Sequence, residues 1–142
     1  MLKRLLVTRH ALALTQGAYY LATGVWPLVS MRSFEAVTGP KRDRWLVKTV
    51  GVLVGVIGVV LLRGSRRRRV DRDLTLLATA SAAGLTAIDT VYASQGRISK
   101  IYLLDALAEI ALVTMWAASE SRARPRASAS RGSAGSHAHR SA

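Results

Sequence analysis

The sequence predicts an all-α protein, a transmembrane four-helix bundle with a disordered basic C-terminal tail. Half of its 142 residues are apolar, yet 21 basic side chains outnumber 8 acidic ones. A soluble domain of this length seldom combines so high a charge with so much apolar sequence. The charges are almost excluded from four stretches, each close to the ~20 residues that a helix needs to cross the hydrocarbon core of a bilayer.

The four predicted spans follow one another with short connections. The first, residues 11–30, carries no charged side chain, and the second, residues 45–62, contains only Lys48. The third covers residues 74–94 and the fourth residues 98–118, with a polar turn between them. Spans two and three lack the charged outer face that the helices of a soluble bundle would show. We therefore expect residues 11–118 to form one membrane-embedded unit.

The distribution of basic residues predicts the orientation. Fourteen of the 21 lysines and arginines fall in residues 1–10, in the loop 63–73 and in residues 119–142. Four spans place these three segments on the same side of the membrane, and the excess of positive charge identifies that side as the cytoplasm. The sequence thus predicts a multi-pass protein of the cell inner membrane with both termini cytoplasmic.

The segments outside the spans have simpler predicted roles. Residues 1–10 place leucines among basic side chains, as in a cytoplasmic interfacial segment. Residues 119–142 are rich in Ser, Ala, Arg and Gly and predict a disordered cytoplasmic tail. The loop between spans two and three holds four consecutive arginines, Arg66, Arg67, Arg68 and Arg69. Because this loop lies against the membrane, we expect it to contact anionic lipid headgroups and no nucleic acid.

Ionisable residues inside the spans mark the candidate functional site, because a charge at membrane depth is costly and faces the bundle interior or water. Asp105 and Glu109 lie one turn apart on the same face of the fourth span. With a rise of ~1.5 Å per residue, Glu109 is the deepest of these charges. We expect a polar cluster that opens outward and is formed by Lys48, Asp89, Asp105 and Glu109 with Tyr20 and Tyr102.

This cluster has two interpretations. In the first, Lys48 pairs with Asp89 or Asp105, and the network only fixes how the helices are arranged. In the second, the surplus of carboxylates binds a ligand, a cation or a proton. The spans contain no histidine to complete a metal site, and we expect no metal and no cofactor. With no cysteine in the chain, disulfides and thiol catalysis are excluded.

Small residues in the second span predict close helix packing. Gly51, Gly55 and Gly58 include a G-x-x-x-G step, which lets two backbones approach each other. The same glycines could serve contacts within the bundle, in a homo-oligomer or with a membrane protein partner. The outer loop 30–44 predicts a plain connector, with a short interfacial helix starting at Ser33 as the alternative.

Three stretches carry a resemblance to a group of known proteins: AYYLATGVWPL from Ala18, MRSFEAVTGPKRDRWLVKTVG from Met31, and YLLDALAE from Tyr102. With these stretches the chain resembles small bacterial four-span membrane proteins of unknown function. The resemblance covers most of the chain up to about residue 118. It implies a compact helical bundle in a bacterial inner membrane and no particular activity.

Three functions from different classes remain open. The first is a bundle that binds a small ligand, a proton or a cation through the intramembrane polar cluster. The second is a structural or accessory subunit of a membrane complex, in which the charges only pair internally. The third is a lipid-modifying enzyme that uses Asp105 or Glu109 as acid and base, although no catalytic motif supports it. We expect the first of these functions. An enzyme is expected less than a protein that only binds.

Overall fold

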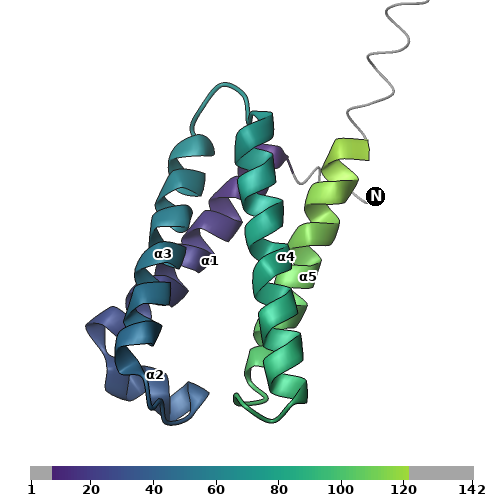
Figure 1. Cartoon of the computed structure of the whole chain (residues 1–142). Coiled ribbons are helices and arrows are strands. Elements are labelled where there is room, and N and C mark those ends of the chain that lie inside the picture. Colours follow the sequence, from purple (N-terminus) through teal and green to yellow (C-terminus); the bar gives the residue numbers. More distant parts are fainter. Residues whose placement is uncertain (1–7, 122–142) are drawn as a thin grey trace, which may run out of the picture.

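The computed structural model describes residues 8–121, and 1–7 and 122–142 are outside this range. The described chain is all α-helical, as predicted, and contains no strand. Its helices are α1 (Arg9–Val29), α2 (Met31–Thr38), α3 (Arg44–Gly64), α4 (Arg72–Ser94) and α5 (Tyr102–Ser121) (Figure 1). The predictions for most of the N-terminal interfacial segment and for nearly all of the disordered tail fall outside the described residues.

Capping residues explain where the helices begin. The side chain of Thr8 accepts a hydrogen bond from the backbone N–H of Ala11 at the start of α1, and Asp71 does the same for Leu74 of α4. The Ser30 side chain accepts from the N–H of Ser33 at the start of α2. The short outer helix, which the sequence offered as the alternative, therefore exists. It is capped by Ser30 and begins at Met31, two residues before the predicted start at Ser33.

The helices form two pairs. α1 packs most extensively against α3, and α4 packs against α5. The two pairs adjoin near the turn between α3 and α4 and diverge toward the end of the molecule where α2 lies (Figure 1). A tightly packed end and a more open end result from this arrangement.

Glycines bring α1 and α3 into backbone contact, as the sequence predicted for α3. A methyl group added at Gly58 would lie 2.6 Å from the backbone nitrogen of Leu21, and one at Gly51 would lie 2.6 Å from the carbonyl oxygen of Gly24. The partner glycine Gly24 was not predicted, and its own added methyl group would lie 2.6 Å from the backbone nitrogen of Gly55. The helices can approach this closely only because no side chain separates them.

Gly55 contributes to this contact through its backbone alone. A methyl group added there would meet nothing within 4 Å. Its missing side chain thus points away from α1, unlike those of Gly51 and Gly58.

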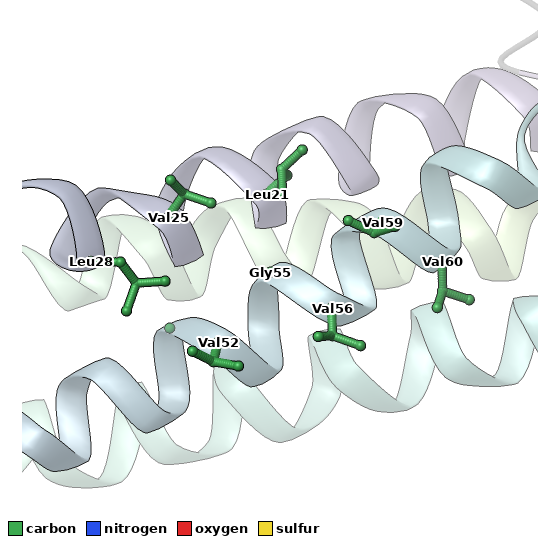
Figure 2. Close-up of a pocket in the computed structure, with 9 residues that line it drawn as sticks. Leu21, Val25, Leu28, Val52, Gly55, Val56, Val59 and Val60 are labelled. Atoms are coloured by element: carbon green, nitrogen blue, oxygen red, sulfur yellow. The ribbon is translucent and has the colours of Figure 1, made fainter.

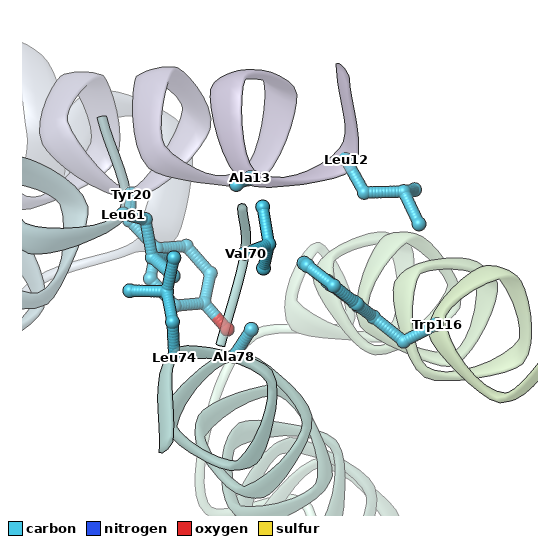
Figure 3. Packing of buried hydrophobic residues seen from close by; sticks show 8 residues of the cluster. All are labelled: Leu12, Ala13, Tyr20, Leu61, Val70, Leu74, Ala78 and Trp116. Atoms are coloured by element: carbon cyan, nitrogen blue, oxygen red, sulfur yellow. The ribbon is translucent and has the colours of Figure 1, made fainter. Parts of the chain in front are cut away.

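The apolar core lies at the packed end of the molecule. Its buried members come from α1, α3, α4, α5 and the α3–α4 turn: Leu12, Ala13, Tyr20, Leu61, Val70, Leu74, Ala78 and Trp116 (Figure 3). Trp116, Ala13 and Ala78 have no exposed surface. The core joins the two helix pairs where they meet.

By length and composition, three of the described helices are apolar enough to cross a membrane: α3, α4 and α5. The sequence predicted four such helices, so the prediction is confirmed for three. α1 is as long as α3, with 21 residues each, but polar side chains such as Gln16, Tyr19 and Tyr20 make it less apolar. α1 differs because its inner face carries the hydrogen-bonding groups of the site described below.

Candidate functional site

A cavity of about 610 Å³ lies between the two helix pairs at the open end of the molecule. All five helices contribute side chains to it. Most of its wall is apolar, with aromatic rings on one side from Tyr19, Tyr20, Trp26 and Phe34. Its size and apolar wall are typical of cavities that hold small organic molecules.

Three carboxylates line this cavity, as the sequence analysis expected from their depth and spacing. Asp89 comes from α4, and Asp105 and Glu109 come from successive turns of α5. Asp89 is 6% exposed and Glu109 is completely buried. Asp105 is partly buried. The α4–α5 pair therefore supplies all the acidic groups, and α1 lies opposite.

Two adjacent tyrosines of α1 each donate a hydrogen bond to one carboxylate of α5. The Tyr20 hydroxyl donates to Oε2 of Glu109 over 2.8 Å, between two fully buried side chains. The Tyr19 hydroxyl donates to Oδ1 of Asp105. These two bonds connect the helix pairs across the inner part of the cavity.

Two buried carboxylate oxygens remain without a hydrogen-bond partner within residues 8–121. They are Oε1 of Glu109 and Oδ2 of Asp89. Buried polar atoms are nearly always paired in proteins, because an unpaired one loses its bonds to water and gains nothing in return. Both atoms belong to residues that line the cavity. Two residues of the cavity wall thus carry buried acceptors that are not satisfied by the described part of the protein.

Lys48 does not join this cluster. Its side chain is exposed, and the described residues contain no ion pair between it and a carboxylate. Four of the α3 residues that line the cavity, Leu46, Val47, Val50 and Val54, lie about 100–160° around the helix from Lys48 at 3.6 residues per turn, and the fifth, Gly51, lies about 60° from it. The predicted pair of Lys48 with Asp89 or Asp105 is therefore wrong, and the rotation of α3 is the reason.

The cation that does reach the cavity is Lys41, which the sequence analysis did not single out. Its ammonium lies 4.9 Å from the ring centre of Tyr102 and donates a hydrogen bond of 2.9 Å to the carbonyl oxygen of Thr38. Both Lys41 and Tyr102 line the cavity. Tyr102 is thus brought to the predicted site, where it holds the outer loop against α5.

α2 borders the cavity and is tied to both neighbouring helices. The Trp26 indole donates to the Ser33 hydroxyl over 2.8 Å and packs edge-on against Phe34. Glu35 accepts two hydrogen bonds from the Arg44 guanidinium, at 2.9 and 2.7 Å. The bonds from Arg44 hold the pKa of Glu35 below its usual range. α2 therefore has a defined position beside the cavity.

A second polar contact lies one helical turn along α1 from Tyr20, toward the packed end. The buried Gln16 side chain accepts from the Trp116 indole and donates to the carbonyl oxygen of Ala78, both over 2.8 Å. These bonds join α1 to α5 and α4 at once. Both polar atoms of the Gln16 amide therefore have a partner, and Gln16 belongs to the framework of the molecule.

The outer surface of the α1–α3 pair carries a shallower apolar groove of about 300 Å³ (Figure 2). Its wall consists of aliphatic side chains and glycines, among them Leu21, Val25, Val56 and Val60. The open space beside Gly55 forms part of it. The groove contains no ionisable group.

The four arginines of the α3–α4 turn lie on the surface at the packed end. Arg66, Arg67, Arg68 and Arg69 are all exposed. Arg67 pairs with Asp71 over 3.6 Å, and its carbonyl oxygen is 2.9 Å from Nε2 of His10. The turn is thus fixed to the start of α1, while most of its positive charge faces outward.

No family model matches this chain, and neither a curated protein nor a solved structure is significantly similar to it. What the site does has to follow from its own geometry and chemistry.

Proposed function

We propose that this chain is an integral membrane protein that binds a small ligand in the cavity between its two helix pairs. The observation that carries the proposal is the pair of buried, unpartnered oxygens of Asp89 and Glu109 in the wall of a cavity of about 610 Å³. Ionisable groups at membrane depth are costly and are generally retained for function. A ligand that occupies the cavity would give these atoms their missing partners.

The proposed topology has four spans: α1 crosses the membrane in addition to α3, α4 and α5. Its support is the backbone contact of α1 with α3, which is apolar enough to span by itself. The polar side chains of α1 that lower its hydropathy are bonded to α4 and α5, so a bilayer would not have to accommodate them. The exposed arginines at the α3–α4 turn support a cytoplasmic position for that turn, next to anionic lipid headgroups.

The alternative is an accessory subunit, whose carboxylates serve only the architecture. The apolar groove between α1 and α3 favours it, because a partner helix could lie there. The double substitution Asp105→Asn, Glu109→Gln separates the two functions. A binding protein should keep or gain stability when costly buried carboxylates are removed, whereas an architectural network should lose several kcal/mol.

The direct test is extraction of bound small molecules from the purified protein in lipid nanodiscs, followed by mass spectrometry. Leu85→Trp places an indole in the cavity, and Leu107→Trp makes the same change on the exposed surface of α5 as a control. We expect a compound that co-purifies with the wild type and with Leu107→Trp and is lost from Leu85→Trp. Identical extracts from all three proteins and from empty nanodiscs would contradict ligand binding in the cavity.

A further inference from the structure

We propose that the ligand is a protonated amine carried on an apolar, aromatic body, an inference that rests on the proposed ligand-binding function. The wall of the cavity contains Asp89 and Glu109, each with a buried carboxylate oxygen that lacks a partner, and aromatic rings line the same cavity. An amine that reaches these oxygens would supply hydrogen-bond donors and positive charge. Each part of this ligand follows from a different property of the wall.

The requirement for a donor follows from the hydrogen bonds that are already formed. The Tyr20 hydroxyl donates its hydrogen bond to Oε2 of Glu109, and the Tyr19 hydroxyl donates its hydrogen bond to Oδ1 of Asp105. Neither hydroxyl can then donate to a ligand. What remains at the inner wall are acceptors, Oε1 of Glu109 and Oδ2 of Asp89. A molecule that bonds to both atoms must bring N–H or O–H groups of its own.

The requirement for positive charge follows from the missing counter-ions. Three carboxylates line the cavity, and the described part of the chain forms no ion pair with any of them. Lys41 also lines it, but its ammonium is engaged by the Thr38 carbonyl and the Tyr102 ring. In its ionised form, a buried carboxylate without a partner is strongly unfavourable, and a cation that donates hydrogen bonds stabilises that form best. An ammonium with N–H groups combines both properties.

The apolar body follows from the remaining wall. Beyond the carboxylates the cavity is lined by aliphatic side chains and by the rings of Tyr19, Tyr20, Trp26 and Phe34. Such a surface favours an aromatic or aliphatic group of moderate size over a small hydrated ion. Inorganic cations therefore fit this cavity less well than an organic amine.

The test compares three probes with one shape: naphthylethylamine, its N,N,N-trimethyl analogue and naphthylethanol. Binding is measured by calorimetry on the full chain in nanodiscs, with empty nanodiscs subtracted. We expect saturable binding of the amine. The affinity of the trimethyl analogue, which has no N–H groups, and that of the neutral alcohol should be lower by about tenfold or more, because charge-assisted hydrogen bonds are lost.

Two variants and a control locate the binding. Asp89→Asn and Glu109→Gln should each weaken the amine by about tenfold or more, since each removes one charged acceptor. Asp73→Asn, at the exposed start of α4 and outside the cavity, should leave the affinity unchanged. Asp89→Asn leaves the Tyr20–Glu109 bond untouched and Glu109→Gln keeps an oxygen for Tyr20, so both variants retain the contact between the helix pairs.

Every other result overturns the inference. Equal affinity for the amine and its trimethyl analogue would remove the need for a donor. If the alcohol bound as tightly as the amine, and the two variants did not change its affinity, the ligand would not need a positive charge. The proposal that the cavity binds a ligand would still stand. Absence of saturable binding for all three probes would contradict an aromatic amine. The extraction experiment with Leu85→Trp decides separately whether the cavity binds any ligand at all.

Discussion

Tyr20 of α1 and Glu109 of α5 are both completely buried and are joined by a hydrogen bond of 2.8 Å. This bond uses one carboxylate oxygen and leaves the other without a partner in the described structure. The same residue therefore ties the two helix pairs together and carries an unpaired acceptor in the wall of the cavity.

Tyr20→Phe should destabilise the protein by about 1–3 kcal/mol, because it leaves both oxygens of a buried carboxyl group unpaired. The measurement is unfolding in mixed micelles by titration with sodium dodecyl sulfate. Tyr92→Phe is the matched control, since Tyr92 is 42% exposed and lies outside the cavity. If the two variants were equally stable, the Tyr20–Glu109 bond would not support the fold.

Gly58→Ala should cost about 1–3 kcal/mol, since its methyl group would lie 2.6 Å from the backbone of Leu21 and force α1 away from α3. Gly55→Ala places the same group in open space on the same helix. This second variant should be neutral or gain up to about 1 kcal/mol from the higher helix propensity of alanine. Equal losses in the same unfolding titration would argue against the backbone contact.

Gln16→Leu should cost about 1–3 kcal/mol, because it removes the acceptor of the buried Trp116 indole N–H. Part of the loss should be recovered in Gln16→Leu/Trp116→Phe, which has no indole left to satisfy. A double-mutant cycle on unfolding free energies measures this coupling. Strict additivity of the two substitutions would show that the bond contributes nothing.

The position of α2 should depend on pH through Glu35, whose pKa is held low chiefly by the hydrogen bonds from Arg44. A carboxyl whose pKa is lower when folded stabilises the contact above its ordinary value of ~4.3, and this contribution is lost as the pH falls through the lower folded value. Proteolysis within α2 should therefore accelerate in acid. Glu35→Gln should cleave quickly at all pH values, and a steep acid dependence in this variant would contradict the assignment.

The proposed topology can be tested because the chain has no cysteine of its own. Single cysteines at Ala36, Gln95 and Arg68, all exposed, report the three connections between the proposed spans. With an impermeant thiol reagent on intact cells, we expect labelling of Ala36→Cys and Gln95→Cys, and of Arg68→Cys only after the cells are opened. Labelling of Arg68→Cys in intact cells would contradict a cytoplasmic α3–α4 turn.

The long helices could be predicted because apolar composition over ~20 residues is a local property of the sequence. Helices α1, α3, α4 and α5 cover the four expected spans with ends shifted by a few residues, and three of them, α3, α4 and α5, are apolar enough to cross a membrane. The largest shift is at α5, which begins at Tyr102 and not at residue 98. The low hydropathy of α1 comes from the same side chains that connect it to the other helix pair. Gln16 and Tyr20 are polar, but they face the interior of the molecule and not its outer surface.

The composition of the site was predicted in part. Asp89, Asp105, Glu109, Tyr20 and Tyr102 reach the cavity because helical spacing fixes which residues share a face. Lys48 does not reach it, because the charge of a residue does not determine how its helix is rotated.

Lys41 could not be found from periodicity, because it lies in an irregular segment whose path depends on the packing of α2. Gly17 and Gly24 escaped notice for a related reason, since they are seven residues apart in a helix and meet the glycines of α3 only after docking.

The divergence of the two helix pairs has a mechanical consequence in a bilayer. In the proposed topology, a body that is narrow at the α3–α4 turn and broad near α2 occupies unequal areas in the two leaflets, like a wedge. Lateral pressure in the broader leaflet then works against the open end. The proposed position in a bilayer would therefore couple the width of the open end to the pressure of the surrounding lipids.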